Sequence, residues 1–242
     1  MSALDLGLVA VFAALASTPQ HVTGFGFALL LAPVLLLILD ASDTVVIVTA
    51  LGGIVAAMVA FRLRREIVWR TAWVLLIASL AGMPLGLAVL LVADEALLQA
   101  LIAIAVIAST LILARGLTLS GGTALAATVG IASGVLRTST STAGPPVIIY
   151  LQGLRWPADE FRATISAYFA ASGVIAVAIF AAAGRVDGDV GWGVLAGLPG
   201  IAAGSVASYL LVGRTSERWF RRAVIALLLT SATIALVTAF VG

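Results

Sequence analysis

The sequence contains no cysteine and no lysine, and His21 is its only histidine. Without thiols the chain can form neither a disulfide framework nor a thiolate metal site. The lack of lysine excludes Schiff-base chemistry, and a lone histidine argues against a histidine-cluster metal site. A nucleotide-binding motif is missing as well. We therefore expect a protein that uses no metal and no cofactor.

Charged residues are also scarce. They make up 10% of the chain, hydrophobic residues make up 62%, and the mean hydropathy is +1.22. Soluble domains carry roughly a quarter charged residues, so this composition indicates a polytopic membrane protein whose first partner is the lipid bilayer. The 13 arginines exceed the 11 acids, an excess that we interpret as an orientation signal and not as nucleic-acid binding. We expect a multi-pass protein of the cell inner membrane.

Apolar segments recur along the whole length of the chain. They fall at about 4–16, 24–39, 44–61, 69–92, 96–114, 120–136, 143–154, 162–183, 190–212 and 219–241. Six approach the roughly 20 residues that a spanning helix requires. The first, second, sixth and seventh are shorter, and each successive pair meets at a polar stretch with glycine or proline, 17–26 and 137–146. These pairs are either half-length hairpins that meet near the midplane or tilted, broken spanning helices.

The two halves of the chain resemble each other at an offset of about 118 residues, as when Gly82 and Gly86 recur as Gly200 and Gly204. Equivalent loops carry opposite charge bias, which an odd number of crossings per repeat would produce. Inverted repeats with broken helices at their interface are typical of secondary transporters. We therefore predict an all-α polytopic membrane protein with two inverted-topology repeats of about five segments each, at 1–118 and 119–242. The short helices would meet near the midplane.

Arg137 is the only arginine that lies away from the predicted loops. It ends an apolar run, and the nearest acids in sequence, Glu95 and Asp159, are more than twenty positions away. An arginine at the bilayer centre costs about 2.5–3.5 kcal/mol on insertion scales, so an uncompensated one suggests a missing partner. An anion fits, because the guanidinium presents a planar fork of donors to oxyanions. The alternative is that Arg137 snorkels to an interface or caps a neighbouring helix.

The polar stretches supply the other candidate substrate-binding residues. They are Ser139, Thr140, Ser141, Thr142 and Gly144 in the second half, with Gln152 beyond them, and Gln20, His21, Thr23 and Gly24 in the first half. The hydroxyls either contact substrate or satisfy carbonyls of their own helix. His21 either couples proton movement to anion movement or has a structural role.

These motifs resemble those of the TauE/SafE sulfite exporters, also called the sulfite/anion permease family. The residues that carry the resemblance are Thr23-Gly24-Phe25-Gly26-Phe27 with Pro33, and Thr142-Ala143-Gly144-Pro145-Pro146 with Trp156-Pro157-Ala158-Asp159. The resemblance covers nearly the whole chain, although fewer glycines stand at both breaks than the family pattern has. It implies export or exchange of small sulfur-containing anions such as sulfite, thiosulfate or organosulfonates.

The sequence thus predicts a secondary transporter, not an enzyme. We expect alternating access, proton coupling and a homodimer, with a sulfur oxyanion as the small-molecule partner. The alternatives are a transporter of another organic anion such as a carboxylate, or a membrane enzyme. An enzyme would require a nucleophile–base pair or metal ligands inside the membrane, and a cation pathway would require carboxylates there; the sequence shows neither.

Overall fold

The computed structural model describes residues 1–211, and over that range the chain forms α-helices and no strand. The helices are α1 (Ala3–Thr23), α2 (Phe27–Leu35), α3 (Ala41–Arg62), α4 (Trp69–Val92), α5 (Glu95–Arg115), α6 (Thr123–Thr140), α7 (Gly144–Gly153), α8 (Ala158–Ala182) and α9 (Gly188–Leu211). The predicted all-α fold is confirmed. The last predicted segment, 219–241, lies outside the described residues.

Six helices of the described range are long and apolar enough to cross a membrane: α1, α3, α4, α5, α8 and α9. The prediction that the first segment is short was wrong. Its polar end remains helical because hydroxyls there donate to carbonyls of the same helix, as from Ser17 to Ala14 O at 3.0 Å and from Thr23 to Pro19 O at 2.9 Å. Such bonds satisfy the side chain without unwinding the backbone.

The two interruptions are shorter than the sequence predicted. Between α1 and α2 the helix is lost only at residues 24–26, and between α6 and α7 only at residues 141–143; we call these the first break and the second break. Pro145 and Pro146 do not unwind the chain further, because they occupy the first turn of α7. Proline is tolerated there, since first-turn N–H groups have no acceptor within the helix.

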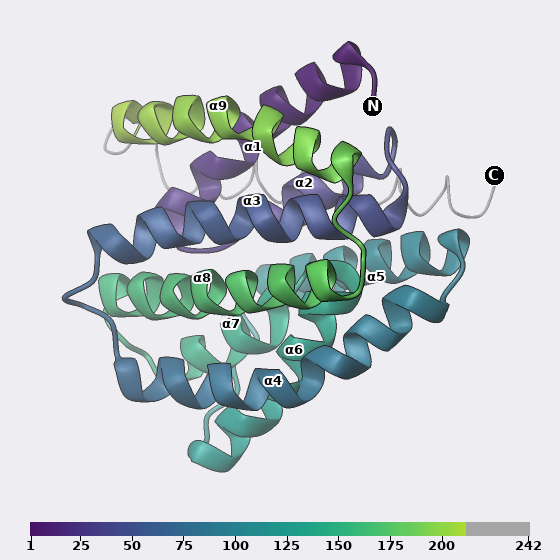
Figure 1. The fold of residues 1–242 in the computed structure, drawn as a ribbon. Helices are drawn as coiled ribbons and strands as arrows, with labels where there is room; N and C mark the ends of the chain where they lie inside the picture. The colour runs from purple at the N-terminus through teal and green to yellow at the C-terminus, as the bar shows by residue number, and fades with distance from the viewer. Residues whose placement is uncertain (212–242) are drawn as a thin grey trace.

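The helices are arranged around a central pair. Figure 1 shows α3 and α8 side by side through the middle of the molecule, with α1 and α9 together on one side and α4 and α6 together on the other. Gly82 and Gly86 of α4 meet the backbone of α6, and Gly200 and Gly204 of α9 meet the backbone of α1, so closely that an added Cβ would collide. These small residues therefore allow the two helices of each pair to approach closely.

Each short pair is a hairpin whose two ends return to the same side of the molecule. The start of α1 (Met1, Asp5) and the segment after α2 (residues 36–40) line one cavity, together with Glu95 and Asp189. The start of α6 (Gly122, Thr123) and the end of α7 line another, together with Arg70. Arg70 lies at the start of α4 (Trp69–Val92) and Glu95 lies just after its end, so the two cavities lie at opposite ends of that helix. The chain thus reverses direction at each break, and of the four helices in the two hairpins α1 is the one long and apolar enough to cross a membrane.

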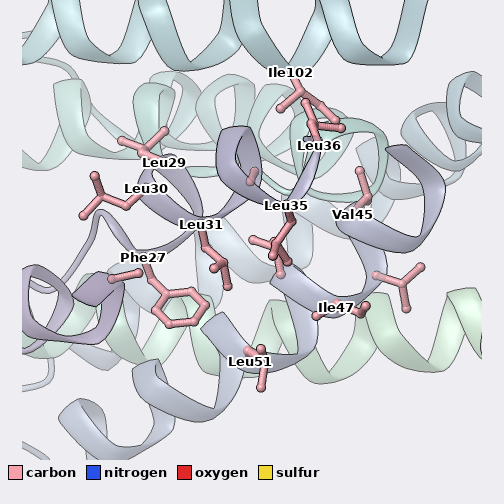
Figure 2. Close-up of a cluster of buried hydrophobic side chains, with 14 of the residues drawn as sticks. Phe27, Leu29, Leu30, Leu31, Leu35, Leu36, Val45, Ile47, Leu51 and Ile102 are labelled. Carbon is pink, nitrogen blue, oxygen red and sulfur yellow. The ribbon is translucent and has the colours of Figure 1, made fainter. Parts of the chain in front are cut away.

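A buried hydrophobic cluster holds the first hairpin in place. Phe27, Leu31 and Leu35 of α2 are at most 1% exposed and pack with Ile47 and Leu51 of α3, as Figure 2 shows. The side chains of α2 that face away from α3 join the same cluster, which extends to α5. A nine-residue helix is too short to be stable alone, so this burial fixes α2 and with it the position of the first break.

Candidate functional site

The two breaks meet at one internal cavity. Its lining includes Gln20, Gly26 and the first turn of α2 from the first half, and Arg137, Ser141, Thr142 and Gly144 from the second. Apolar side chains form the remaining walls: Phe25, Phe27, Leu29, Val48, Ile148 and Phe169. About 30 Å³ is open to the centres of water molecules, which is room for one or two waters. Segments more than a hundred residues apart thus form one small, mostly apolar chamber.

Arg137 is the only cation that lines this chamber in the described part of the chain. Its side chain is 4% exposed, and its Cζ lies 5.0 Å from the centroid of the Phe169 ring. The Nε and Nη2 atoms are buried without a hydrogen-bond partner. Within residues 1–211, the two ion pairs join other groups, the N-terminus with Asp189 and Arg162 with Asp159. The snorkelling alternative does not describe this side chain, because it is buried.

The position of Arg137 is fixed by the contact between α6 and α4. Gly130 and Gly134 of α6 lie so close to the backbone of α4 that a Cβ at either would collide with it. One turn later, the Thr138 hydroxyl donates to the Met83 carbonyl at 2.7 Å. Backbone contact on both sides of Arg137 leaves this part of α6 little freedom to shift. The guanidinium is therefore held at the chamber by a rigid element.

Of the predicted row of hydroxyls, three form hydrogen bonds and one has no partner. Ser139 donates to Val135 O at 2.8 Å, Thr140 donates to Leu136 O at 3.0 Å, and the Thr140 and Thr142 hydroxyls lie 2.6 Å apart. Ser141 differs from all three, because its Oγ is buried without a partner and its φ of 58° is left-handed. This backbone conformation is unfavourable for a non-glycine residue. Ser141 therefore has a hydroxyl without a partner, and it lines the same chamber as Arg137.

The N-terminus of α2 brings backbone donors to the same chamber. Gly26 caps the helix without a side-chain hydrogen bond, and Ala28 and Leu29 in the first turn line the cavity. First-turn N–H groups have no acceptor within their helix, and the helix dipole favours negative charge at this end. At the second break the two prolines carry no N–H, so Gly144 is the only backbone donor among the first three residues of α7.

Residues at the end of α1 and in the first break bind mainly to one another. Gln20 spans the break, because its Nε2 donates to Gly24 O at 3.2 Å and its Oε1 accepts from the Phe27 N–H at 3.2 Å. The Thr23 hydroxyl donates to Phe25 O at 2.8 Å. Of the four residues predicted here, Gln20 lines the chamber, whereas His21, Thr23 and Gly24 do not.

His21 and Gln152 have surroundings of their own. The His21 Nδ1 lies 2.9 Å from Ser17 O, and the His21 carbonyl accepts a hydrogen bond from Arg162 Nη2 at 2.8 Å. Gln152 is near the C-terminal end of α7, where its carbonyl accepts from the Arg155 N–H at 3.2 Å. Neither residue lines the chamber.

Several lining residues were not predicted from the sequence. Phe169, Val48 and Gly52 belong to α3 and α8, whose apolar pattern carries no sign of a binding site. A buried hydrogen bond from Tyr168 Oη to Ser133 Oγ, at 2.8 Å, ties α8 to α6. Ser133 in turn donates to Ala143 O at 2.6 Å in the second break. A serine in an apolar run was the only signal that could have indicated this link.

Comparison with known proteins gives one result. The family model described as Sulfite exporter TauE/SafE matches residues 9–234, which is nearly the whole chain and includes both breaks. No curated protein and no solved structure matches the sequence.

Proposed function

The chain belongs to the sulfite exporter TauE/SafE family, a family of membrane transporters and not of enzymes, and from that premise we propose that it exports small sulfur oxyanions as a secondary transporter. Arg137 is the group that binds the charge of the anion. Sulfite, thiosulfate and organosulfonates are the candidate substrates, and the cell inner membrane is the expected location. Proton coupling and a homodimer stay predictions.

The single observation that carries this proposal is the unpaired guanidinium. Two of its nitrogens are buried without a partner in a side chain that is 4% exposed. An uncompensated charge in an apolar environment costs several kcal/mol, so it requires a compensating ligand. The Phe169 ring offers only a weak cation–π contact to this charge. An oxyanion supplies both the missing charge and the acceptors.

The arrangement of the helices supports two inverted repeats, 1–118 and 119–242. The α4–α6 contact has a counterpart in the α9–α1 contact, down to single residues. A Cβ at Gly86 would collide with the Thr138 hydroxyl of α6, and a Cβ at Gly204 would collide with the Ser17 hydroxyl of α1. Gly53 and Gly173 touch each other where α3 crosses α8. We propose a pseudo-two-fold axis at this crossing.

This symmetry supports an alternating-access mechanism. One hairpin enters from each side, and the two breaks meet at the chamber that the proposal treats as the substrate site. The chamber has room for one or two waters. Rocking of one repeat against the other about the α3–α8 contact would open it to either side in turn.

The test is a binding titration of purified wild-type protein and Arg137→Gln with sulfite, thiosulfate, methanesulfonate and acetate. Removing one partner of a buried charge pair costs about 2–5 kcal/mol, so we expect at least a roughly 30-fold loss of affinity. Arg137→Lys retains the positive charge but loses the planar pair of guanidinium donors, so it should bind the sulfur anions with intermediate affinity. Arg70→Gln, at an exposed arginine, is the matched control.

Unchanged sulfur-anion affinity in a folded Arg137→Gln protein would contradict the proposal. Tighter binding of acetate than of any sulfur anion by the wild type would favour the carboxylate alternative. Thermal unfolding of each variant, measured without ligand, separates a loss of binding from a loss of fold.

A further inference from the structure

We propose that the cavity at which α4 and α6 begin binds the phosphate group of an anionic phospholipid. This cavity, which we call the Arg70 cavity, shares no lining residue with the chamber between the two breaks. The inference is independent of the proposed function, because it involves neither Arg137 nor the transport of an anion.

The Arg70 cavity carries a positive charge that its lining does not balance. Arg70 is the only charged residue among the described residues that line it. Neither of the two ion pairs within residues 1–211 includes Arg70. The cavity at the other end of α4 is lined by five acidic residues instead. An anion is therefore attracted to the Arg70 cavity and repelled from the cavity at the opposite end.

The start of α6 brings hydrogen-bond donors to the Arg70 cavity. Gly122 caps this 18-residue helix without a side-chain hydrogen bond, and the Ala126 N–H donates to Gly122 O at 3.2 Å, which closes the first turn. The N–H groups of residues 123–125 have no acceptor within the helix. Thr71 and Thr123 add hydroxyls to the lining. Free N–H groups and the dipole at a helix N-terminus suit a phosphate group.

The side chain of Tyr150 is the observation that points to a ligand. Tyr150 lines the Arg70 cavity but is only 5% exposed, and within residues 1–211 its hydroxyl forms no hydrogen bond. A buried tyrosine hydroxyl usually has a partner. Tyr168 follows this rule, since it donates to Ser133 Oγ at 2.8 Å. A phosphate oxygen in the Arg70 cavity would accept the hydrogen bond that Tyr150 lacks.

The size of the Arg70 cavity favours a ligand larger than a small inorganic anion. About 350 Å³ is open to the centres of water molecules, compared with about 30 Å³ in the chamber between the breaks. Val74, Leu154 and Trp156 give the cavity apolar walls, and tryptophan is typical of the level of the lipid headgroups. A phosphate that carries a glycerol unit would use both the volume and these walls.

An exposed apolar surface leads away from the Arg70 cavity along α4 and α6. Both helices begin at the cavity, and Gly130 of α6 meets Leu75 and Ala78 of α4 just beyond it. Close to this contact, Ile77 of α4 is 63% exposed and Ile131 of α6 is 41% exposed. A lipid whose phosphate lies in the cavity would bury its acyl chains on this surface, whereas a soluble phosphate ester could not use it.

The sequence around the Arg70 cavity indicates an anionic lipid of the cytoplasmic leaflet. Arg62 ends α3, and Arg64 and Arg65 follow it in the short connection to α4. Short loops rich in arginine are typical of the cytoplasmic side, where basic pockets between helices attract anionic headgroups. A zwitterionic headgroup would place its ammonium beside Arg70, with no carboxylate among the described lining residues to balance it.

The experiment is a lipid titration of the 242-residue chain in a maltoside detergent, after removal of bound lipid, measured by native mass spectrometry. The ligands are dioctanoyl phosphatidylglycerol, dioctanoyl phosphatidylcholine and glycerol 3-phosphate. We expect the first phosphatidylglycerol to bind at least about tenfold more tightly than either of the others, because only this ligand combines a net negative charge with acyl chains. Equal affinity for glycerol 3-phosphate would overturn the assignment to a lipid, and equal affinity for phosphatidylcholine would overturn the role of charge.

Three variants test the residues of the Arg70 cavity. Arg70→Gln should weaken phosphatidylglycerol binding at least about tenfold, as expected when a hydrogen bond to a charged group is lost. Tyr150→Phe should weaken it about tenfold without lowering the thermal stability of the lipid-free protein, because its hydroxyl has no partner within residues 1–211. Arg64→Gln is the matched control, since Arg64 is exposed, does not line the cavity and donates to Phe61 O at 3.2 Å. Equal losses in Arg64→Gln and Arg70→Gln would show a general attraction of lipid to basic residues and would overturn the site.

The same variants separate this inference from the proposed function. Arg137→Gln should retain phosphatidylglycerol binding, and Arg70→Gln should retain the affinity of the wild type for sulfur anions. Loss of sulfur-anion binding in Arg137→Gln alone supports the proposed function whatever the lipid titration gives. If Arg70→Gln weakens the binding of sulfur anions and leaves phosphatidylglycerol binding unchanged, the Arg70 cavity belongs to the anion pathway and the lipid inference is overturned.

Discussion

The first break and the second break occupy corresponding places in the two halves, yet their polar groups are used differently. In the first break, the amide of Gln20 and the hydroxyl of Thr23 bind backbone groups on either side of the interruption. At the second break, Arg137 near the end of α6 and Ser141 in the break hold buried polar atoms that have no partner. The polar groups of one interruption are satisfied internally, whereas the other leaves polar atoms unpaired.

The comparison extends to the first residue of each break, which is left-handed in both. Gly24 has a φ of 84°, and its α-carbon faces α8, where a Cβ would lie 2.9 Å from Ile165 Cγ2. Ser141 has a φ of 58° and faces the chamber instead. Glycine occupies the position where the backbone packs closely, and serine occupies the position that borders a cavity. The proposed anion site accounts for the strain and the unpaired hydroxyl at Ser141, since neither contributes to stability.

The largest expected effect in this comparison is that of Gly24→Ser. This substitution places at the start of the first break the residue type, serine, that begins the second break. We expect the free energy of unfolding to fall by about 2–4 kcal/mol, because left-handed strain adds to the collision with Ile165 and Arg162. The measurement is thermal unfolding in detergent. Gly184→Ser is the matched control, since Gly184 is also left-handed but has open space around its α-carbon. Equal destabilisation by both substitutions would mean that close packing at the first break contributes nothing to the stability of the fold.

The reverse exchange, Ser141→Gly, should have a smaller effect on stability and the opposite sign. We expect a gain of about 1 kcal/mol in the free energy of unfolding, because strain and an unpaired buried hydroxyl are both removed. Methanesulfonate affinity should fall about tenfold, as expected for one hydrogen bond to a charged group. Ser141→Ala removes the hydroxyl but retains the strained backbone, so it should lose the same affinity and show only part of the gain in stability. Wild-type affinity in Ser141→Ala would remove this hydroxyl from the site.

Much of the fold could be predicted because the bilayer imposes a strong pattern on sequence. The long apolar runs of the sequence predicted the long helices. Gly82 and Gly86, which the sequence marks by their recurrence in the second half, lie where two helices approach closely. The exact ends of the interruptions did not, because Thr138, Ser139 and Thr140 bond within or between helices. The sequence shows that a hydroxyl is present but not which acceptor it finds.

The site could be predicted only in part, for a related reason. Arg137 was identified because a cation in an apolar run has an energetic cost that is visible in the sequence. Phe169, Val48 and Gly52 were not, because they reach the chamber through the packing of α3 against α8. Apolar residues in an apolar helix carry no mark of the cavity that they line. Tertiary contact, and not local pattern, decides which of them face it.

The smallest expected effect is that of His21→Gln, which tests whether the first break takes part in proton coupling. His21 does not line the chamber; its ring nitrogen lies 2.9 Å from the Ser17 carbonyl, and its own carbonyl binds Arg162. We therefore expect the pH profile of methanesulfonate uptake into proteoliposomes to match that of the wild type between pH 5 and pH 8, the range in which histidine titrates. Methanesulfonate is chosen because its charge does not change over this range, so any pH dependence belongs to the protein. A flattened profile in His21→Gln would show that the first break moves protons, and the contrast between a structural break and a binding break would no longer hold.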